Sequence, residues 1–408
     1  MKKASAIVGQ SGGPTSVINS SLAGVIDGCA EAKSIDRLLG MHWGIEGFLA
    51  DDIIDLSSEP AETVKALRRT PSSALGSSRH KVKDHDLPNI LARLKQHNVR
   101  TMFMIGGNDT MDTIHRVTEY AASQGYELHG VGVPKTVDND LYGTDHTPGF
   151  PSAARFVALS AQQAGRLARD MQKVDQFVVY QSIGRDAGWL TAAAAAAKCD
   201  ACDAPHLVYM PERVFDRDKF LADVQAAHKN YGYVSIFCGE GIKYADGMPV
   251  SASTTKDKFA NTEYGAMGGT SVAFQLHRMV SQEFGWRGEF QVTESLPMAA
   301  IDRALPLDLE EAYNCGLQAA KLADDGMTNV MVTMVRESNN PYRCKFATAP
   351  LKDVAVRAKP MPDEYINEAG NYPSQAFIDY LRPLLGELPR YAQLKYQPAP
   401  LCRARQQL

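Results

Sequence analysis

The sequence predicts an α/β fold made of two doubly wound, Rossmann-like lobes with mostly parallel sheets, followed by an irregular C-terminal extension. Short apolar runs alternate with longer stretches of helical periodicity, as in βαβ units whose sheet is covered on both faces. The 408 residues, of which 44% are apolar, suffice for two or three domains. We expect a first lobe over residues 1–145 with roughly 300–335 returning to it, a second lobe over 146–299, and the extension over 336–408.

Seven apolar runs are the expected strands, in chain order "SAIVG", "TMFMIGG", "LHGVGVP", "QFVVYQSIGR", "HLVYMP", "YVSIFCGEG" and "NVMVTMV". Helical periodicity begins at about Ser16 and Met111, continues in "AGWLTAAAAAAK", and covers residues 152–171, 214–229, 269–284 and 308–325. From about Arg336 the periodicity weakens and prolines recur in "KPMPDEY" and "QPAP", which predicts an irregular wrap that ends in a basic tail.

Charge and composition argue against several classes of protein. The net charge of −4 comes from interspersed acids and bases, so nothing indicates a nucleic-acid or membrane partner. No apolar segment reaches the ~18 residues of a membrane span, and the first residues lack a signal-peptide core. The seven cysteines are an odd number at scattered spacings, which fits reduced thiols in the cytoplasm. Cys199 and Cys202 form a lone CxxC that we interpret as incidental.

Open α/β sheets bind ligands beyond the carboxyl ends of their strands, and five polar loops lie at such ends. They are "GQSGGPTS" (9–16), "GGNDT" (106–110), "PKTVDND" (134–140), "SIGRDAG" (182–188) and "CGEG" (238–241). Glycines before a helix expose backbone N–H groups to a phosphate, although the first loop lacks both the Walker A ending and the GxGxxG spacing. Each loop taken alone also fits an ordinary turn.

Together the loops predict phosphoryl transfer. That reaction needs a cation for phosphate oxygens, oxygen ligands for Mg²⁺, and a carboxylate that accepts a hydroxyl proton. The loop 134–140 offers a lysine, a threonine and two aspartates. The guanidinium of Arg185 could donate two hydrogen bonds to a phosphate. Glu240, between two glycines, could accept hydrogen bonds from sugar hydroxyls.

On these motifs, with "GTDHTPGFPSAA" and "DLEEAY" in the same order, the chain resembles the phosphofructokinase family and most closely its pyrophosphate-dependent branch. The resemblance implies a reversible, Mg²⁺-dependent transfer from pyrophosphate to the 1-hydroxyl of fructose 6-phosphate, in a cytoplasmic homodimer. It also implies that the first lobe binds pyrophosphate and magnesium and the second lobe binds the sugar.

The resemblance assigns a role to each site residue. Catalytic roles fall on Asp138 as the general base and on Lys135, Arg185 and Asp109. Donor contacts fall on Gly12, Gly13, Arg79, Gly107, Asp109 and Lys135. Acceptor contacts fall on Thr136, Val137, Asp138, Ile183, Gly184, Arg185 and Glu240. Magnesium contacts fall on Asn108 and Asp140.

The donor assignment has a physical reason. ATP-using relatives have glycine at the positions of Asp109 and Lys135. A carboxylate about 4 Å from an α-phosphate costs about 4 kcal/mol at an effective dielectric near 20, which weakens ATP binding about a thousandfold. We therefore expect Asp109 to exclude the nucleotide while Lys135 holds pyrophosphate.

The chain departs from the family pattern at the metal-binding position and at the contacts to the acceptor's phosphate. The family's metal-binding aspartate is Asn108 here, and the arginine that holds the sugar's 6-phosphate falls at Met298. Two further phosphate-contacting arginines fall near Gln176 and Glu289. We favour the hypothesis that these contacts are replaced by basic residues such as Arg287, Arg303 or Lys243, or by basic residues of a partner subunit. The alternative is that the acceptor is another sugar phosphate, such as sedoheptulose 7-phosphate, or a free polyol.

Two other classes of protein stay open at this point. A nicotinamide-dependent oxidoreductase would explain glycine loops on an α/β sheet, but the GxGxxG spacing is missing. A non-catalytic phosphate- or sugar-binding module would not need Asp138.

Overall fold

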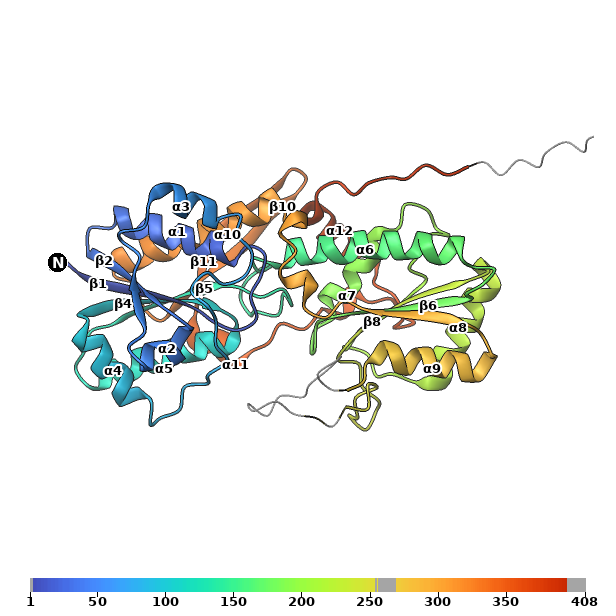
Figure 1. Ribbon diagram of the computed structural model, residues 1–408, viewed down its shortest axis with the longest axis horizontal. Helices are drawn as coiled ribbons and strands as arrows, with labels where there is room; N and C mark the ends of the chain where they lie inside the picture. The colour runs from blue at the N-terminus through green and yellow to red at the C-terminus, as the bar shows by residue number, and fades with distance from the viewer. Residues whose placement is uncertain (1–2, 254, 256–268, 395–408) are drawn as a thin grey trace, which may run out of the picture.

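The computed structural model describes residues 3–253, 255 and 269–394, and it forms two lobes side by side, each around its own sheet (Figure 1). The first sheet has the order β11-β10-β5-β4-β1-β2-β3, and the second has the order β7-β8-β6-β9. All neighbouring strands are parallel except the pairs β2–β3 and β10–β11. The prediction of two α/β lobes with mostly parallel sheets is confirmed.

The first lobe takes its strands from both ends of the chain. They are β1 (Ala4–Gln10), β2 (Ile35–Met41), β3 (Ile53–Asp55), β4 (Val99–Gly106), β5 (His129–Pro134), β10 (Val330–Asn339) and β11 (Tyr342–Pro350). Its helices are α1 (Ile18–Glu31), α2 (Gly44–Leu49), α3 (Ala61–Leu67), α4 (Leu87–Gln96), α5 (Asn108–Ser123), α10 (Pro306–Asp324) and α11 (Leu351–Val356). Since β1 has β2 on one side and β4 on the other, the chain turns in opposite directions there, which is where such sheets bind ligands.

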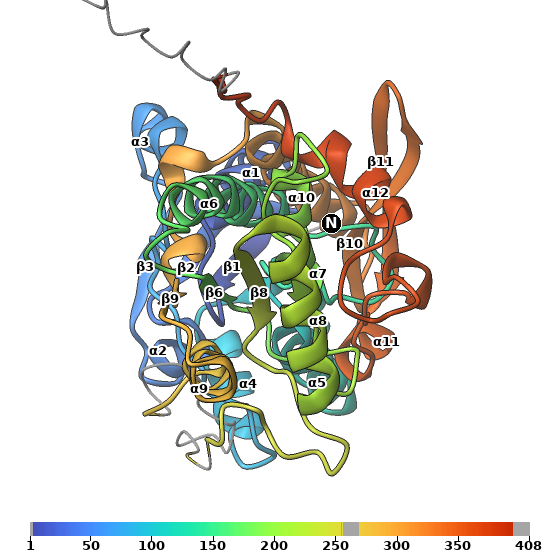
Figure 2. The same cartoon turned by 90° about the vertical axis from the view of Figure 1, so that its right-hand side faces the viewer.

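The second lobe contains the strands β6 (Phe177–Ser182), β7 (Leu207–Tyr209), β8 (Val234–Gly239) and β9 (Gly288–Val292). Its helices are α6 (Phe150–Asp170), α7 (Trp189–Ala193), α8 (Arg217–Tyr231), α9 (Val272–Phe284) and α12 (Gln375–Leu385). Short 3₁₀ turns are η1 (Ala194–Ala197), η3 (Leu296–Met298), η4 (Ile301–Arg303) and η5 (Asp363–Tyr365). Seen end-on, α6 lies over one face of this sheet and α9 over the other (Figure 2).

Several elements differ from the sequence prediction. The alanine-rich helix is shorter than expected, since α7 passes into η1 after five residues. Strands β2, β3, β9 and β11 were not predicted, because they lie nearer the edges of their sheets and carry exposed positions that interrupt the apolar signal. Asn108 and Asp109 belong to the first turn of α5 and not to a loop.

The segment after Arg336 is more regular than expected. It holds the end of β10, all of β11, which pairs with β10, and α11, whose Leu351 and Val354 are buried against the first sheet. An irregular stretch then crosses to the second lobe, where α12 packs its buried face into the core that α6 shares. The expected basic tail lies outside the described residues.

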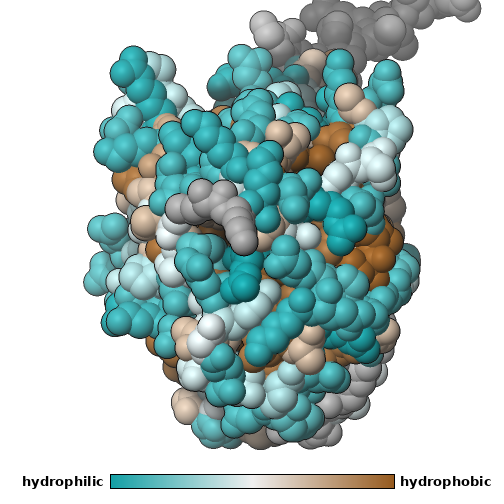
Figure 3. All heavy atoms as spheres, turned by 90° about the vertical axis from the view of Figure 1, so that its left-hand side faces the viewer, coloured by the Kyte–Doolittle hydropathy of each residue, from teal (hydrophilic) through white to brown (hydrophobic). Residues whose placement is uncertain are grey.

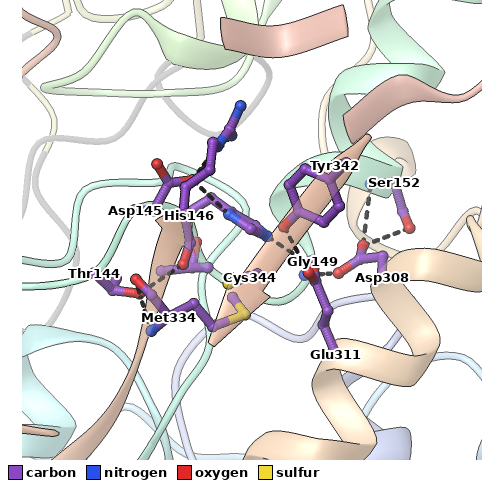
Figure 4. A network of polar contacts seen from close by, with 12 residues as sticks. Thr144, Asp145, His146, Gly149, Ser152, Asp308, Glu311, Met334, Tyr342 and Cys344 are labelled. Atoms are coloured by element: carbon purple, nitrogen blue, oxygen red, sulfur yellow. Dashed lines mark hydrogen bonds and ion pairs between the residues drawn. The ribbon is translucent and has the colours of Figure 1, made fainter. Parts of the chain in front are cut away.

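Polar side chains join the elements where the two lobes meet (Figure 4). His146 is fully buried and lies 2.8 Å from both Asp145 Oδ2 and Glu311 Oε2. Arg336 donates to Asp145, and Tyr342 Oη donates to Glu311 at 2.6 Å. Burial by itself would lower the pKa of His146, but the two carboxylates outweigh it and raise the pKa above its usual value. These contacts hold the connection between β5 and α6 against α10 and β10.

We predict that His146→Gln destabilises the protein most at low pH. A raised folded-state pKa means that the stabilisation is fully present below about pH 6.5 and is lost as the pH rises through the raised value. Breaking a buried pair costs about 3 kcal/mol. Thermal unfolding midpoints of wild type and variant, measured from about pH 6 to about pH 9, should therefore converge as the pH rises. A constant difference would contradict a charged His146.

The surface of the first lobe is mostly hydrophilic, with apolar side chains in separate patches (Figure 3). Among the described residues, no helix combines the length and the apolar character that a bilayer crossing demands.

Candidate active site

The predicted loops lie at the carboxyl ends of parallel strands in both sheets. Strands β1, β4 and β5 lead into the loops 9–16, 106–107 and 134–140, and β6 and β8 lead into 182–188 and 238–241. Parallel strands bring their carboxyl ends to one edge of a sheet, so three loops of the first lobe are neighbours, as are two of the second.

Lys135 joins the loops of the first lobe. Its side chain is 3% exposed, and its Nζ donates to the carbonyl oxygen of Gly13 at 2.7 Å. Gly12 has a φ of +76°, and a Cβ there would lie 3.3 Å from the same Nζ. Glycine therefore fits both the backbone conformation and the approach of the lysine. The backbone of Lys135 donates to Gly106, directly before Gly107.

Burial lowers the pKa of Lys135 to about 8, with Asp138 and Asp140 acting in the opposite direction and Arg79 adding to the decrease. The ammonium is still mostly charged at neutral pH. A buried, charged lysine on a glycine-rich loop is suited to bind an oxyanion.

Asp109 projects from the N-terminal turn of α5, where its carboxylate is 76% exposed and lies 3.3 Å from Lys81 Nζ. The position suits an acidic side chain because the helix N-terminus carries partial positive charge. Lys81 was missed by the sequence reasoning, although it stands two residues after Arg79 in the basic stretch "RHKVK".

A cavity of about 820 Å³ opens beside the first loop and is lined by Gly12, Gly13 and Arg79. Trp43, which is 51% exposed, lines it from the first lobe, and Met298 lines it from η3. A Cβ at Gly13 would lie 2.5 Å from Met298 Cε, so this methionine packs directly on the loop. Met298, where the resemblance leads us to expect an arginine, therefore faces the Gly12–Gly13 loop.

Four ionisable groups surround Asp138. Burial raises the pKa of Asp138, and the charges of Asp140 and Glu240 raise it further, while Arg185 and Lys135 lower it. Burial also raises the pKa of Glu240 to about 7. Carboxylates from both lobes thus interact with cations from both lobes, and perturbed carboxylates of this kind are common at catalytic sites.

The two loops of the second lobe contact each other closely. The backbone N–H of Gly184 donates to Glu240 Oε1 at 3.3 Å, and that of Glu240 donates to Ser182 at 3.2 Å. A Cβ at Gly241 would lie 1.5 Å from the carbonyl oxygen of Arg185, so only glycine fits there. Arg185 itself is exposed, which leaves its guanidinium accessible to a ligand.

The other predicted acceptor residues differ in what they can offer. Thr136 Oγ1 accepts a hydrogen bond from the backbone of Asp138 at 3.1 Å, which shapes the loop. The Val137 side chain is 6% exposed and packs in the core of the second lobe, so only its backbone can reach a ligand. Ile183 packs partly against the same core.

The predicted magnesium residues lie against the same short segment of the C-terminal extension. Asn108 Nδ2 donates to the carbonyl oxygens of Val354 at 3.1 Å and Arg357 at 2.9 Å. An aspartate at position 108 would have no N–H to donate to these carbonyl oxygens, which explains the asparagine. The Oδ1 of Asn108 can still accept a hydrogen bond or coordinate a metal ion. The Asp140 carbonyl accepts from the backbone of Lys359 at 2.7 Å, and burial raises the pKa of its carboxyl group. Among the described residues, no three acidic, histidine or cysteine side chains form a metal cluster.

Most candidate replacements for the missing arginines lie away from these loops. Gln176 and Glu289 stand at the amino ends of β6 and β9, opposite to Glu240, and Arg287 pairs there with Asp175 at 2.9 Å. Arg303 donates to Ser160 and stacks over Phe156. Of the three candidates Arg287, Arg303 and Lys243, all in the described part of the chain, Lys243 contacts a loop of the site, where its Nζ is 3.8 Å from Asp186.

Comparisons with known proteins agree with this arrangement. A family model described as phosphofructokinase matches residues 5–293. The pyrophosphate–fructose 6-phosphate 1-phosphotransferase of Halomonas elongata is 38% identical over 392 residues, covering 94% of this chain and 92% of that protein. A crystal structure of pyrophosphate-dependent phosphofructokinase from Marinobacter aquaeolei aligns at a TM-score of 0.85 and 33% identity, covering 98% of each chain. The sulfofructose kinase of Alkalicoccus urumqiensis is 31% identical over 367 residues, covering 90% and 92%.

Proposed function

The chain belongs to the phosphofructokinase family, and from this we propose that it catalyses reversible phosphoryl transfer from pyrophosphate to the 1-hydroxyl of fructose 6-phosphate. The products are fructose 1,6-bisphosphate and phosphate. The observation that carries the proposal is Lys135, a buried cation whose Nζ lies on the Gly12–Gly13 loop while its charge acts on Asp138. One lysine thus connects a phosphate-binding backbone to a general base.

In the mechanism that we propose, the backbone of the Gly12 and Gly107 loops and the cations Lys135 and Arg79 hold pyrophosphate. Glu240, Thr136 and the backbone around Gly184 orient the sugar. Asp138 accepts the proton of the attacking hydroxyl as the oxygen–phosphorus bond forms, and Arg185 neutralises charge on the phosphoryl group in transfer. In the reverse direction Asp138 returns that proton to the sugar oxygen.

The carboxylates fit a magnesium cofactor. Mg²⁺ usually takes one or two protein carboxylates and completes its shell with phosphate oxygens and water. Asp140 would provide the carboxylate and Asn108 an amide oxygen. The ion would neutralise charge on the phosphate oxygens of the donor.

We further propose that the first lobe, residues 1–145 with the return near 300–335, binds pyrophosphate and magnesium, and that residues 146–299 bind the sugar. We expect a cytoplasmic homodimer in which basic residues of a partner subunit complete the acceptor site. Arg287 supports such sharing, because it lies at the amino ends of β6 and β9, opposite to the loops of its own chain's site.

A second acceptor is favoured by one observation. The resemblance places the family's phosphate-binding arginine at Met298, and one relative is named sulfofructose kinase. Among the described residues of one chain, Lys243 is the candidate cation that contacts a loop of the site, so an acceptor with a different group at the far end of the sugar is the alternative. Sedoheptulose 7-phosphate and free polyols belong to this alternative.

The test is a pyrophosphate-driven acceptor screen. Purified protein with Mg²⁺ and pyrophosphate receives fructose 6-phosphate, sedoheptulose 7-phosphate, a sulfonated fructose or a free polyol, and released phosphate is measured. We expect the highest kcat/KM with fructose 6-phosphate, and no release of phosphate when Mg²⁺ is left out. A higher value with another acceptor would transfer the assignment to it, and no turnover with any acceptor would favour a binding module.

A further inference from the structure

We propose that the C-terminal extension positions the catalytic loop through Asn139, with Lys359 and Tyr380 as the positioning residues. The inference rests on the proposed function, because it concerns the loop that carries Asp138 and Asp140. Both positioning residues come from the extension, more than 200 positions away in the sequence.

Asn139 is the residue on which the extension acts. It lies between the two aspartates, is fully buried, and has a φ of +55°, a left-handed conformation that asparagine adopts more readily than other non-glycine residues when its side chain is hydrogen-bonded. Its side chain is held at both ends: Nδ2 donates to Tyr380 Oη at 3.0 Å, and Oδ1 accepts from Lys359 Nζ at 3.3 Å. Contacts from outside the loop thus stabilise the conformation of the residue between Asp138 and Asp140.

Lys359 supports the loop through more than Asn139. Its Nζ also donates to the carbonyl oxygens of Thr144 at 3.1 Å and Asp145 at 2.7 Å, and its backbone N–H donates to Asp140 at 2.7 Å. The preceding residue, Ala358, forms an antiparallel bridge with Leu141. The Lys359 carbonyl accepts from Trp189 Nε1 at 3.3 Å, which anchors the segment to the second lobe.

Tyr380 connects the loop to the junction between the lobes. Its hydroxyl accepts from Asn139 and donates to the Asp145 carbonyl at 2.9 Å, and its own carbonyl accepts from Arg336 at 2.6 Å. Arg336 also pairs with Asp145. The hydroxyl is therefore one link in a buried network, and its removal leaves a fully buried amide without its partner.

The first experiment compares two tyrosines of the extension. Tyr380→Phe removes the hydroxyl that holds Asn139, whereas Tyr372→Phe removes a buried hydroxyl that has no hydrogen-bond partner in the described part of the chain. We expect Tyr380→Phe to lower kcat about tenfold with nearly unchanged KM for both substrates, because a misplaced loop harms the reaction more than binding. Tyr372→Phe should retain wild-type kcat. Equal effects of the two substitutions would overturn the proposal.

The second experiment tests whether the effect passes through Asn139. Asn139→Gly tolerates the left-handed backbone but lacks the side chain, so Tyr380→Phe should lower kcat little further in that background. Additive losses would contradict the proposal. For the lysine, Lys359→Met should lower kcat, and Lys359→Arg, which keeps the charge and donors, should retain more activity.

A measurement without substrates separates this inference from the proposed function. Amide hydrogen exchange over residues 136–141 should accelerate in Tyr380→Phe and remain at the wild-type rate in Tyr372→Phe. Unchanged exchange in Tyr380→Phe would overturn the positioning role even if the enzyme is active. Lack of turnover by wild type would instead remove the proposed function and leave the exchange result valid.

Discussion

Asp138→Asn is expected to lower kcat by about 10²–10⁴-fold with little loss of stability. An amide has nearly the same volume as the carboxyl group, but it does not take a proton from the attacking hydroxyl. Asp138 is half-buried among like charges from Asp140 and Glu240. Replacement of one of these charges by a neutral group relieves repulsion, so the folded state is preserved or slightly stabilised.

Steady-state kinetics in both directions, together with a thermal unfolding midpoint, test this prediction. Asp186→Asn is a suitable control because Asp186 is exposed on the neighbouring loop and loses the same charge. Its effect on kcat should be far smaller. Near-normal rates for Asp138→Asn would contradict its assignment as the base.

Asp109→Gly combined with Lys135→Gly is expected to abolish most pyrophosphate activity and to produce measurable activity with ATP. Lys135 supplies the buried positive charge at the Gly12–Gly13 loop, so its removal should weaken pyrophosphate binding strongly. Removal of Asp109 eliminates a repulsion of about 4 kcal/mol at an effective dielectric near 20 if an α-phosphate lies about 4 Å away. Its high exposure lowers this value through screening by water and salt.

Donor preference is measured as the ratio of kcat/KM for ATP and pyrophosphate with fructose 6-phosphate as acceptor. Asp112→Gly with Lys135→Gly is the matched control, because Asp112 lies on the same helix and pairs with Arg116 at 3.9 Å. That control should lose pyrophosphate activity without a gain with ATP. An unchanged donor ratio in the Asp109 variant would show that other residues choose the donor.

The sequence located most of the candidate site because its chemistry is local. Glycine-rich or acidic loops at strand ends can be recognised from a few consecutive residues, and the structure brings Lys135, Asp138, Arg185 and Glu240 within electrostatic reach of one another. The roles of these residues are still predictions. Lys81, Lys359 and Tyr380 could not be found in this way, because each contacts a segment that is distant in the chain.

Asn108 shows the same limit. In the sequence it is a departure from a metal-binding pattern, and in the structure its amide binds two carbonyl oxygens near the end of α11. Met298 is similar, since only the tertiary contact with Gly13 shows that it faces the donor loop. Neither fact follows from composition or periodicity.

By itself, the sequence determined the alternation of strands and helices, the parallel sheets and the loops that carry charged residues, because apolar periodicity and glycine placement act over a few residues. Only the tertiary structure decided how the extension returns to both lobes, which partner Asp109 has, and what holds Asn139 in its left-handed conformation. Contacts of the extension join residues up to 249 positions apart, and their free energy depends on burial and distances that form only when the chain folds.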